Sequence, residues 1–196
     1  MATFYETRHS DLYCRDSVYS KKTLGNTSHL HYHIELAFVK SGKTRVTVDS
    51  TVYDVQSGDI IVVFPNQIHR FETLEREKYI LLIVNPDIIS ELIKPFTSSV
   101  PVSNLLKGGA LDSELAPIIQ KISETYYSDT SWKDAILRGY LLAFFGLLLQ
   151  KLSLKDIQAK ESNVLGVILN YCINNADKPL SLEILEKVIH ISKYYI

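Results

Sequence analysis

The stretch "SHLHYHIELAFVKSG", Ser28–Gly42, holds three of the chain's six histidines. His29, His31 and His33 occupy alternate positions, and Glu35 continues the spacing. Alternate residues of an extended strand point to the same side, so the four side chains share a face if the whole segment is one strand. Four polar side chains facing a barrel interior need partners there. The pattern is consistent with a metal site, a small-molecule pocket or a hydrogen-bonded polar lining.

Composition and charge are those of an ordinary globular protein. The chain has 196 residues, of which 46% are hydrophobic and 22% charged, and its net charge is −1. It therefore has no general attraction for nucleic acid or anionic membranes. Cys14 and Cys172 form no disulfide framework, and the polar N-terminus is not a signal peptide. The longest apolar run, Tyr140–Leu149, is about half of a membrane span, so we expect a cytoplasmic protein without a membrane segment.

Before residue 86 the sequence alternates short β-rich runs with turn signals, which is typical of an antiparallel sandwich or barrel. The predicted strands include Thr44–Val48, Thr51–Val55, Ile60–Phe64 and Tyr79–Val84. The predicted turns are Ser41–Lys43, Asp49–Ser50, Gln56–Asp59 and Pro65–Asn66. The side chains expected to point inward are Val46, Val48, Val52 and Val55.

After Pro86 the apolar residues recur at helical spacing. A short helix is expected over Asp87–Lys94, bounded by Pro86 and Pro95. The next helix begins at Asp112 or Ser113, which places Pro117 in its first turn. The further predicted helices are Trp132–Leu152, Asn163–Asn175 and Leu182–His190. Strands first and helices afterwards predict a mainly β protein with added α-helices.

The spacing of His29, His31, Glu35 and Gly42 resembles the first motif of the cupin superfamily. The second motif is matched more loosely by "GDIIVVFPNQIHRF", Gly58–Phe71, which lacks the usual glycine after the proline. This form is similar to the effector-binding domains of AraC/XylS-type bacterial transcription regulators. The resemblance implies a cupin-like double-stranded β-barrel, followed by a helical hairpin and a partial helix-turn-helix segment.

The C-terminal segment "NVLGVILNYCINNADKPLSLEILEKVIHISKYYI", Asn163–Ile196, resembles the opening of that family's DNA-binding domain, with a turn around His190–Ser192. The implied organisation is residues 1–90 as the effector-binding barrel, 91–155 as a helical dimerisation region, and 156–196 as a truncated start of the DNA-binding domain. A recognition helix would begin near Tyr194, and residues 162–196 carry three lysines against three acidic residues. We expect no complete DNA-binding surface in this chain, and promoter DNA as a partner of the full-length protein only.

The resemblance assigns the effector pocket to His29, His31, Glu35 and His69, with an N-terminal arm over Thr3–Arg15 able to fold over it. The expected ligand is a small molecule, of which sugars are the family's familiar case, and no cofactor is expected. The alternative is a divalent metal held by the same four residues, as in a metal-dependent cupin enzyme of the dioxygenase or isomerase type. His33 is expected to add only a surface contact. No nucleophile or phosphate-loop motif is present, so we expect no enzymatic activity.

The predicted helix Trp132–Leu152 is apolar nearly all round, whereas a surface helix needs one apolar stripe. Two stripes lie side by side, and one of them can pack on the barrel while the other packs on a second copy. The first stripe is Leu137, Leu141, Phe144 and Leu148, and the second is Ile136, Tyr140, Ala143 and Leu147. We assign the first stripe to a homodimer interface. The chain is thus expected to be the effector-sensing and dimerisation part of a one-component transcription regulator.

Overall fold

A computed structural model describes residues 3–108 and 113–156, and from there residues 168, 171, 172, 175 and 179–189. The chain divides into two compact units, Met1–Asp156 and Ile157–Ile196, which are described separately. Among these residues no helix has both the length and the apolar character needed to cross a membrane.

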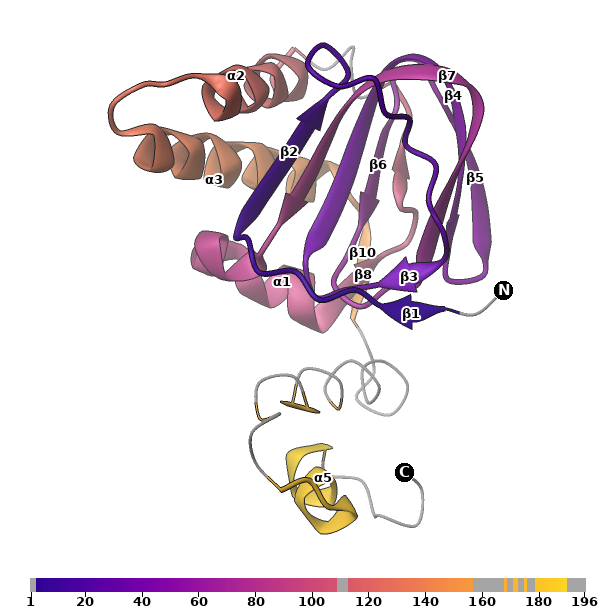
Figure 1. Cartoon of the computed structure of the whole chain (residues 1–196), viewed down its shortest axis with the longest axis vertical. Helices are drawn as coiled ribbons and strands as arrows, with labels where there is room; N and C mark the ends of the chain where they lie inside the picture. The colour runs from indigo at the N-terminus through magenta and orange to yellow at the C-terminus, as the bar shows by residue number, and fades with distance from the viewer. Residues whose placement is uncertain are drawn as a thin grey trace. The chain divides into compact units, whose positions relative to one another are not determined.

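The first unit is built on one antiparallel barrel sheet of eight strands (Figure 1). Its strands are β1 (Phe4–Tyr5), β2 (Leu12–Asp16), β3 (His29–Leu30), β4 (Ile34–Val48), β5 (Thr51–Gln56), β6 (Ile60–Val63), β7 (His69–Val84) and β9 (Leu105–Leu106). The strand order is β1-β3-β7-β4-β6-β9, with β2 also on β7 and β5 also on β4. The one parallel pair is β1 with β3. The sheet therefore continues past residue 90, because β9 pairs with β6. A separate pair joins β8 (Ser99–Pro101) to β10 (Leu154–Asp156).

The central strands are buried on both faces, which explains their unbroken apolar runs. Inward side chains fill the barrel, and they include Ala37, Val39, Ile61, Val63, Tyr79, Leu81 and Ile83. Outward side chains pack against the helices, and they include Leu36, Phe38, Ile60, Val62, Ile80 and Leu82. The four predicted strands are confirmed, and so is the inward position of Val46, Val48 and Val55. Val52 was placed wrongly. It is 58% exposed, because it lies three residues from Val55 and so faces the other side of β5.

The predicted turn at Ser41–Lys43 is wrong. β4 runs through these residues as an irregular strand, and its pairing with β7 shifts register on both sides of Ser41. Gly42 has a φ of +83°, and a Cβ there would lie 2.3 Å from the carbonyl oxygen of Arg76. The glycine thus allows a bulge and a close approach of two strands, and it does not reverse the chain.

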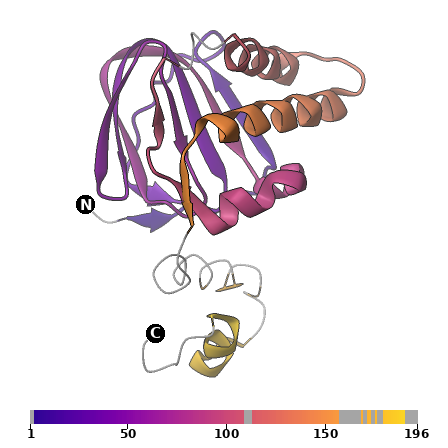
Figure 2. The same ribbon diagram turned by 180° about the vertical axis from the view of Figure 1, so that it is seen from behind.

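Three helices cover one side of the barrel, away from β5 (Figures 1 and 2). They are α1 (Ile93–Ser98), α2 (Leu115–Tyr127) and α3 (Lys133–Lys151), and the 3₁₀ helix η1 (Pro86–Leu92) precedes α1. The predicted end of a helix before Pro95 is wrong, because Pro95 lies in the first turn of α1, where its missing N–H is not needed. Pro117 lies in the first turn of α2 as predicted. The N-cap position is occupied by Glu114 and not by Ser113, and the Glu114 side chain makes no capping hydrogen bond. The alternative cap, Asp112, is outside the described residues.

The stripe assigned to the dimer interface is buried within a single chain. Leu137 is 5% exposed, and Leu141, Phe144 and Leu148 are 0% exposed, because all four pack into the core between the helices and the sheet. The prediction that they form an exposed surface is therefore wrong. The second stripe faces outward in part. Ile136 is 38% exposed and Ala143 is exposed, whereas Tyr140 and Leu147 are half-buried against the core.

The second unit is described mainly by α5 (Leu182–Ile189). This helix agrees with the predicted one, whose final residue, His190, lies outside the described part of the chain. Most of the predicted helix Asn163–Asn175 and the predicted turn around His190–Ser192 also lie outside it.

The burial of α3 gives a stability prediction. Leu141→Ala should lower the free energy of unfolding by about 2–5 kcal/mol, because it leaves a cavity in a packed core. Ile136→Ala, on the exposed stripe of the same helix, should lower it much less. Urea unfolding of both variants followed by circular dichroism measures the difference. Equal losses would contradict the packing of α3.

Candidate functional site

The barrel brings four predicted site residues into one cluster. His29 on β3 is the cross-strand neighbour of His69, the first residue of β7. Glu35 projects inward from β4, and His31 lies in the short connection between β3 and β4. One ligand atom from each of the four residues lies within 4.8 Å of the others, and all four residues are buried. The structure thus places together His29, His31, Glu35 and His69, which come from separate motifs of the sequence.

His33 does not belong to this cluster. The segment from Ser28 is not one strand, because the backbone bends at Tyr32 and His33 before β4 begins. The bend turns the ring of His33 away, and its Nε2 donates to the carbonyl of Ser10 at 3.0 Å. The expected surface contact is wrong, since His33 is buried.

The three clustered imidazoles share one hydrogen-bonding arrangement. Each Nδ1 contacts a backbone carbonyl, that of Thr27 for His29, of His33 for His31 and of Gln67 for His69, at 2.9, 3.0 and 2.9 Å. A carbonyl only accepts, so each Nδ1 carries the proton and donates. In the neutral ring this leaves the lone pair on Nε2. The Nε2 atoms of His31 and His69 lie 2.9 and 3.3 Å from Oε2 of Glu35.

The buried carboxylate controls the electrostatics of the cluster. Burial raises the pKa of Glu35, but hydrogen bonds and charge from His31 and His69 outweigh it and hold the pKa well below the ordinary value. Burial lowers the pKa of His69, and the hydrogen bond and charge of Glu35 reverse this and raise it. The pKa of His29 is lowered, first by burial and then by His69. Glu35 therefore needs a positive neighbour, which a protonated His69 or a cation can supply.

These residues fit a divalent metal ion. Imidazole nitrogens with one carboxylate are common ligands of Zn, Fe, Ni and Mn. Metal-bound histidines usually donate the other ring N–H to a carbonyl or carboxylate, as all three do here. His29, His31, Glu35 and His69 would hold the ion, which would supply Lewis acidity at the edge of the cavity described next.

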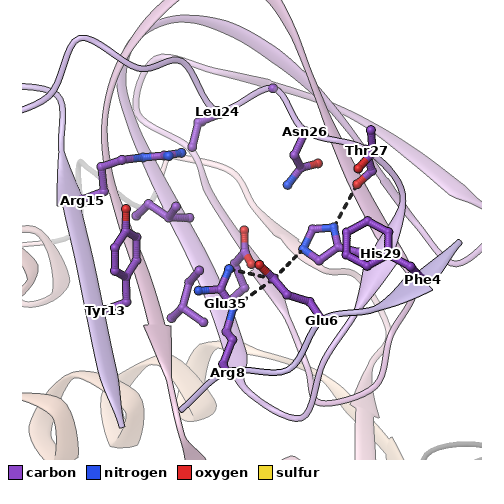
Figure 3. A pocket seen from close by; sticks show the side chains of 13 residues that line it. Phe4, Glu6, Arg8, Tyr13, Arg15, Leu24, Asn26, Thr27, His29 and Glu35 are labelled. Atoms are coloured by element: carbon purple, nitrogen blue, oxygen red, sulfur yellow. Dashed lines mark hydrogen bonds and ion pairs between the residues drawn. The ribbon is translucent and has the colours of Figure 1, made fainter. Parts of the chain in front are cut away.

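A cavity of about 380 Å³ lies inside the barrel beside the cluster. Of the predicted residues, His29 and Glu35 line it, whereas His31 and His69 are not among its lining residues. Its wall also includes Leu24, Leu81 and Ile83, which are apolar, and Asn26 and Thr27, which are polar (Figure 3). This size is at the lower end of the range for small-molecule sites, about 300–1,000 Å³.

The N-terminal segment supplies the residues that the sequence analysis did not assign. Phe4, Glu6, Arg8, Tyr13 and Arg15 all line the cavity. β1 holds this segment beside β3, and Oε2 of Glu6 lies 3.5 Å from Nε2 of His29. The resemblance led us to expect an arm over Thr3–Arg15, but no motif in it marks individual residues. For Tyr13 and Arg15, the alternation with the outward residues Cys14 and Asp16 in β2 is a local signal.

Comparisons with known proteins agree with this geometry. Residues 17–85 match the cupin domain family. Over 94% of this chain and 73% of the other, the fold is similar to that of ToxT from Vibrio cholerae, with a TM-score of 0.56 at 12% identity. The likeness to ToxT shows a common fold. No curated protein matches the chain in sequence.

Two further solved structures are similar over less of their length. The AraC-like transcriptional activator CuxR has a TM-score of 0.49 at 19% identity, over 84% of this chain and 59% of CuxR. An oxalate decarboxylase from Bacillus subtilis has a TM-score of 0.28 at 26% identity, over 31% of this chain and 18% of the enzyme. The chain thus spans less than two thirds of the length of both proteins.

The cluster gives a prediction about metal. After dialysis against Zn²⁺, Ni²⁺ or Mn²⁺, the protein should retain about one equivalent of at least one of these ions, measured by elemental analysis. His31→Ala and Glu35→Gln should each weaken retention at least about tenfold. His9→Ala removes an exposed histidine outside the cluster and is the matched control. Retention far below one equivalent, or equal loss in the control, would rule out a metal at these residues.

Proposed function

We propose that this chain, in which residues 17–85 match the cupin domain family and whose fold is similar to that of ToxT, is the effector-sensing and dimerisation part of a one-component transcription regulator of the AraC type. The cavity inside the barrel would hold a small-molecule effector. His29 and Glu35 would contact it, with His31 and His69 orienting Glu35 from behind. The protein would act in the cytoplasm, where its DNA target lies, and the full-length protein would bind promoter DNA.

The observation that carries this proposal is the position of β2 between the cavity and the helices. Alternate residues of a strand face opposite sides. Tyr13 and Arg15 face inward and line the cavity. Cys14 and Asp16 face outward, where Cys14 joins the core shared with α2 and α3. A ligand that moves β2 from inside would therefore act directly on the helices outside.

Hydrogen bonds tie the outer face of β2 to α2. Oδ2 of Asp16 accepts from the hydroxyl of Ser123 at 2.8 Å and from Nζ of Lys40 at 3.2 Å. The same Lys40 Nζ donates to Oε1 of Gln120 at 3.1 Å. The hydroxyl of Tyr127 donates to the carbonyl of Cys14 at 3.1 Å. Asp16 is 1% exposed, so these bonds are shielded from water and a shift of β2 would strain them.

The outward stripe of α3 is suited to a second copy of the chain. Its exposed members are Ile136 and Ala143, whereas Tyr140 and Leu147 are half-buried and also pack against the core. Gly139 and Gly146 lie beside the stripe on α3. A Cβ built on either glycine meets nothing within 4 Å, so another helix could approach closely there. Paired half-sites on DNA require a two-fold protein, and a homodimer through this stripe would provide it.

A metal-dependent cupin enzyme, of the dioxygenase or isomerase type, is the second candidate. The observation in its favour is the cluster itself, in which three imidazoles present Nε2 beside a buried carboxylate. A bound ion would supply Lewis acidity, while the residues of the cavity would bind and orient the substrate. The connection of β2 to α2 has no role in that function, whereas it is required for signalling, so we favour the regulator.

Coupling between the cavity and the helices can be tested with a ligand found by thermal-shift screening. In the unmodified protein the ligand should change the dimer dissociation constant, within the usual allosteric range of about 5–150-fold. Ser123→Ala removes the bond from α2 to the Asp16 carboxylate, and Tyr127→Phe removes the bond from α2 to the Cys14 carbonyl. Each variant should leave ligand affinity nearly unchanged and reduce the effect on dimerisation, measured by analytical ultracentrifugation. An undiminished effect in both variants would exclude this route.

The dimer itself is tested by charge on the outward stripe. Ile136→Glu combined with Ala143→Glu, both at exposed positions of the stripe, should give a folded monomer, because the carboxylates would have to be buried unpaired at the interface. Val52→Glu introduces the same charge at an exposed valine on the opposite side of the barrel and should leave the dimer intact. Sedimentation velocity distinguishes the species. An unmodified chain that stays monomeric at micromolar concentrations would contradict the proposal.

A further inference from the structure

The cavity inside the barrel has two different polar ends (Figure 3). His29 and Glu35 lie at one end, close to Glu6 and Arg8. Arg15 lies on the β2 side and extends toward Leu24. The two arginines of the cavity differ in their partners, and this difference indicates what the cavity binds.

Arg8 already has an acidic partner. Its guanidinium donates to Oε2 of Glu6, with distances of 3.0 Å from Nε and 2.8 Å from Nη2. Oε2 of Glu35 contacts Nε2 of His31 and His69, and a proton or a cation held by this cluster compensates its charge. Neither Arg8 nor Glu35 therefore calls for an anionic ligand.

Arg15 has no acidic partner among the described residues. Its Nη2 donates to the carbonyl of Thr23 at 3.2 Å, and its guanidinium lies over the ring of Tyr79, 5.5 Å from the centroid. Nε of Arg15 is buried and has no hydrogen-bond acceptor. A shielded donor left unpaired on a cationic group is energetically costly, so a missing acceptor is expected.

Glu77 does not fill this role. It is two residues from Tyr79 on β7, so it faces the same side of the strand, and it is 4% exposed. Both of its carboxylate oxygens lack a hydrogen-bond partner, so no bond joins them to Arg15. The inner wall of the barrel thus holds an arginine without an acidic partner.

We infer that the effector is a small organic anion whose carboxylate or phosphate group is bound by Arg15. This inference rests on the proposed effector-sensing function and names the ligand class of that site. A guanidinium binds carboxylate and phosphate through parallel charged hydrogen bonds, which supply the acceptor that Nε lacks. A neutral sugar would satisfy polar groups near His29 but would leave the charge of Arg15 uncompensated.

The position of Arg15 also connects the anion to the output of the protein. Arg15 is followed directly in β2 by Asp16, whose carboxylate binds Ser123 on α2. An anion that draws Arg15 into the cavity therefore acts on the residue next to the connection with the helices. The proposed anion-binding residue Arg15 and the residue that contacts α2, Asp16, therefore both lie in β2.

The test uses bare anions, so it does not depend on knowing the rest of the effector. Acetate and inorganic phosphate are titrated into the protein at constant ionic strength set with sodium chloride, with acetamide as the neutral probe. The Nε–H signal of Arg15 is followed by NMR, and the melting temperature is recorded in parallel. We expect a saturable change at Arg15 with at least one anion and none with acetamide. Comparing the dissociation constants of acetate and inorganic phosphate then distinguishes a carboxylate ligand from a phosphate ligand.

Matched variants decide whether the effect belongs to Arg15. Arg15→Gln should raise the apparent dissociation constant of the anion about tenfold or more, because a charged hydrogen bond is lost. Arg15→Lys keeps the charge and should retain part of the affinity. Arg45→Gln, at an exposed arginine paired with Asp54, should have no effect.

Three results would overturn the inference. They are the absence of any saturable change at Arg15, an equal response in Arg15→Gln, and binding that appears only after Glu77→Gln, which would make Glu77 the native partner of Arg15. None of these results would contradict the proposed regulator function, which is tested separately by the effect of a ligand on the dimer dissociation constant. A neutral ligand that still changes dimerisation would leave that function standing and remove only the anion.

Discussion

The pairing of β4 with β7 is the interaction on which the rest of the structure depends. The two strands run side by side from Ile34 opposite Val84 to Val48 opposite His69. This register places Glu35 on the inner face of the barrel and His69 at the start of β7, within reach of His29 and His31. It also buries both faces of the sheet, one in the barrel interior and one under the helices. A slip of one residue would exchange the two faces and dismantle the site.

Under the proposed function, burial on both faces of the sheet would connect ligand binding in the cavity to the helices outside. In a half-exposed sheet, a ligand that moves a strand changes only the solvent on the other side. In this fold a shift of β2 would displace side chains that pack against α2 and α3. Tyr13 and Arg15 line the cavity, while Cys14 and Asp16 lie on the side of the helices. Close-packed interiors transmit such shifts because they compress little. This packing is what the proposed sensing function would require, and the exposed residues Ile136 and Ala143 of α3 would be where a signal reached a second copy.

The cluster and the cavity divide two chemical tasks between them. The carboxylate of Glu35 contacts His31 and His69, and a cation or a proton within the cluster balances its negative charge. Arg15, across the cavity, has a buried Nε without a hydrogen-bond acceptor among the described residues. A ligand that spans the cavity could donate a hydrogen bond to Glu35 at one end and accept one from Arg15 at the other. The metal and the anion are compatible for this reason, since they concern different ends.

The amino-acid sequence by itself determined the class of fold, four segments of the longer strands β4 to β7, and the four members of the cluster. Period-two apolar runs and turn residues are local properties, and the spacing of His29, His31, Glu35 and His69 identifies the motif. Only the tertiary structure decided which apolar stripe of α3 is covered, because Leu141 and Ile136 are equally apolar and only packing separates them. It also decided the partners of Arg15 and the bulge at Gly42, which depend on β7, more than thirty residues away. The local sequence pattern indicates which face of a strand or helix a side chain occupies. The residue that it contacts there depends on pairing between strands that are far apart in the sequence.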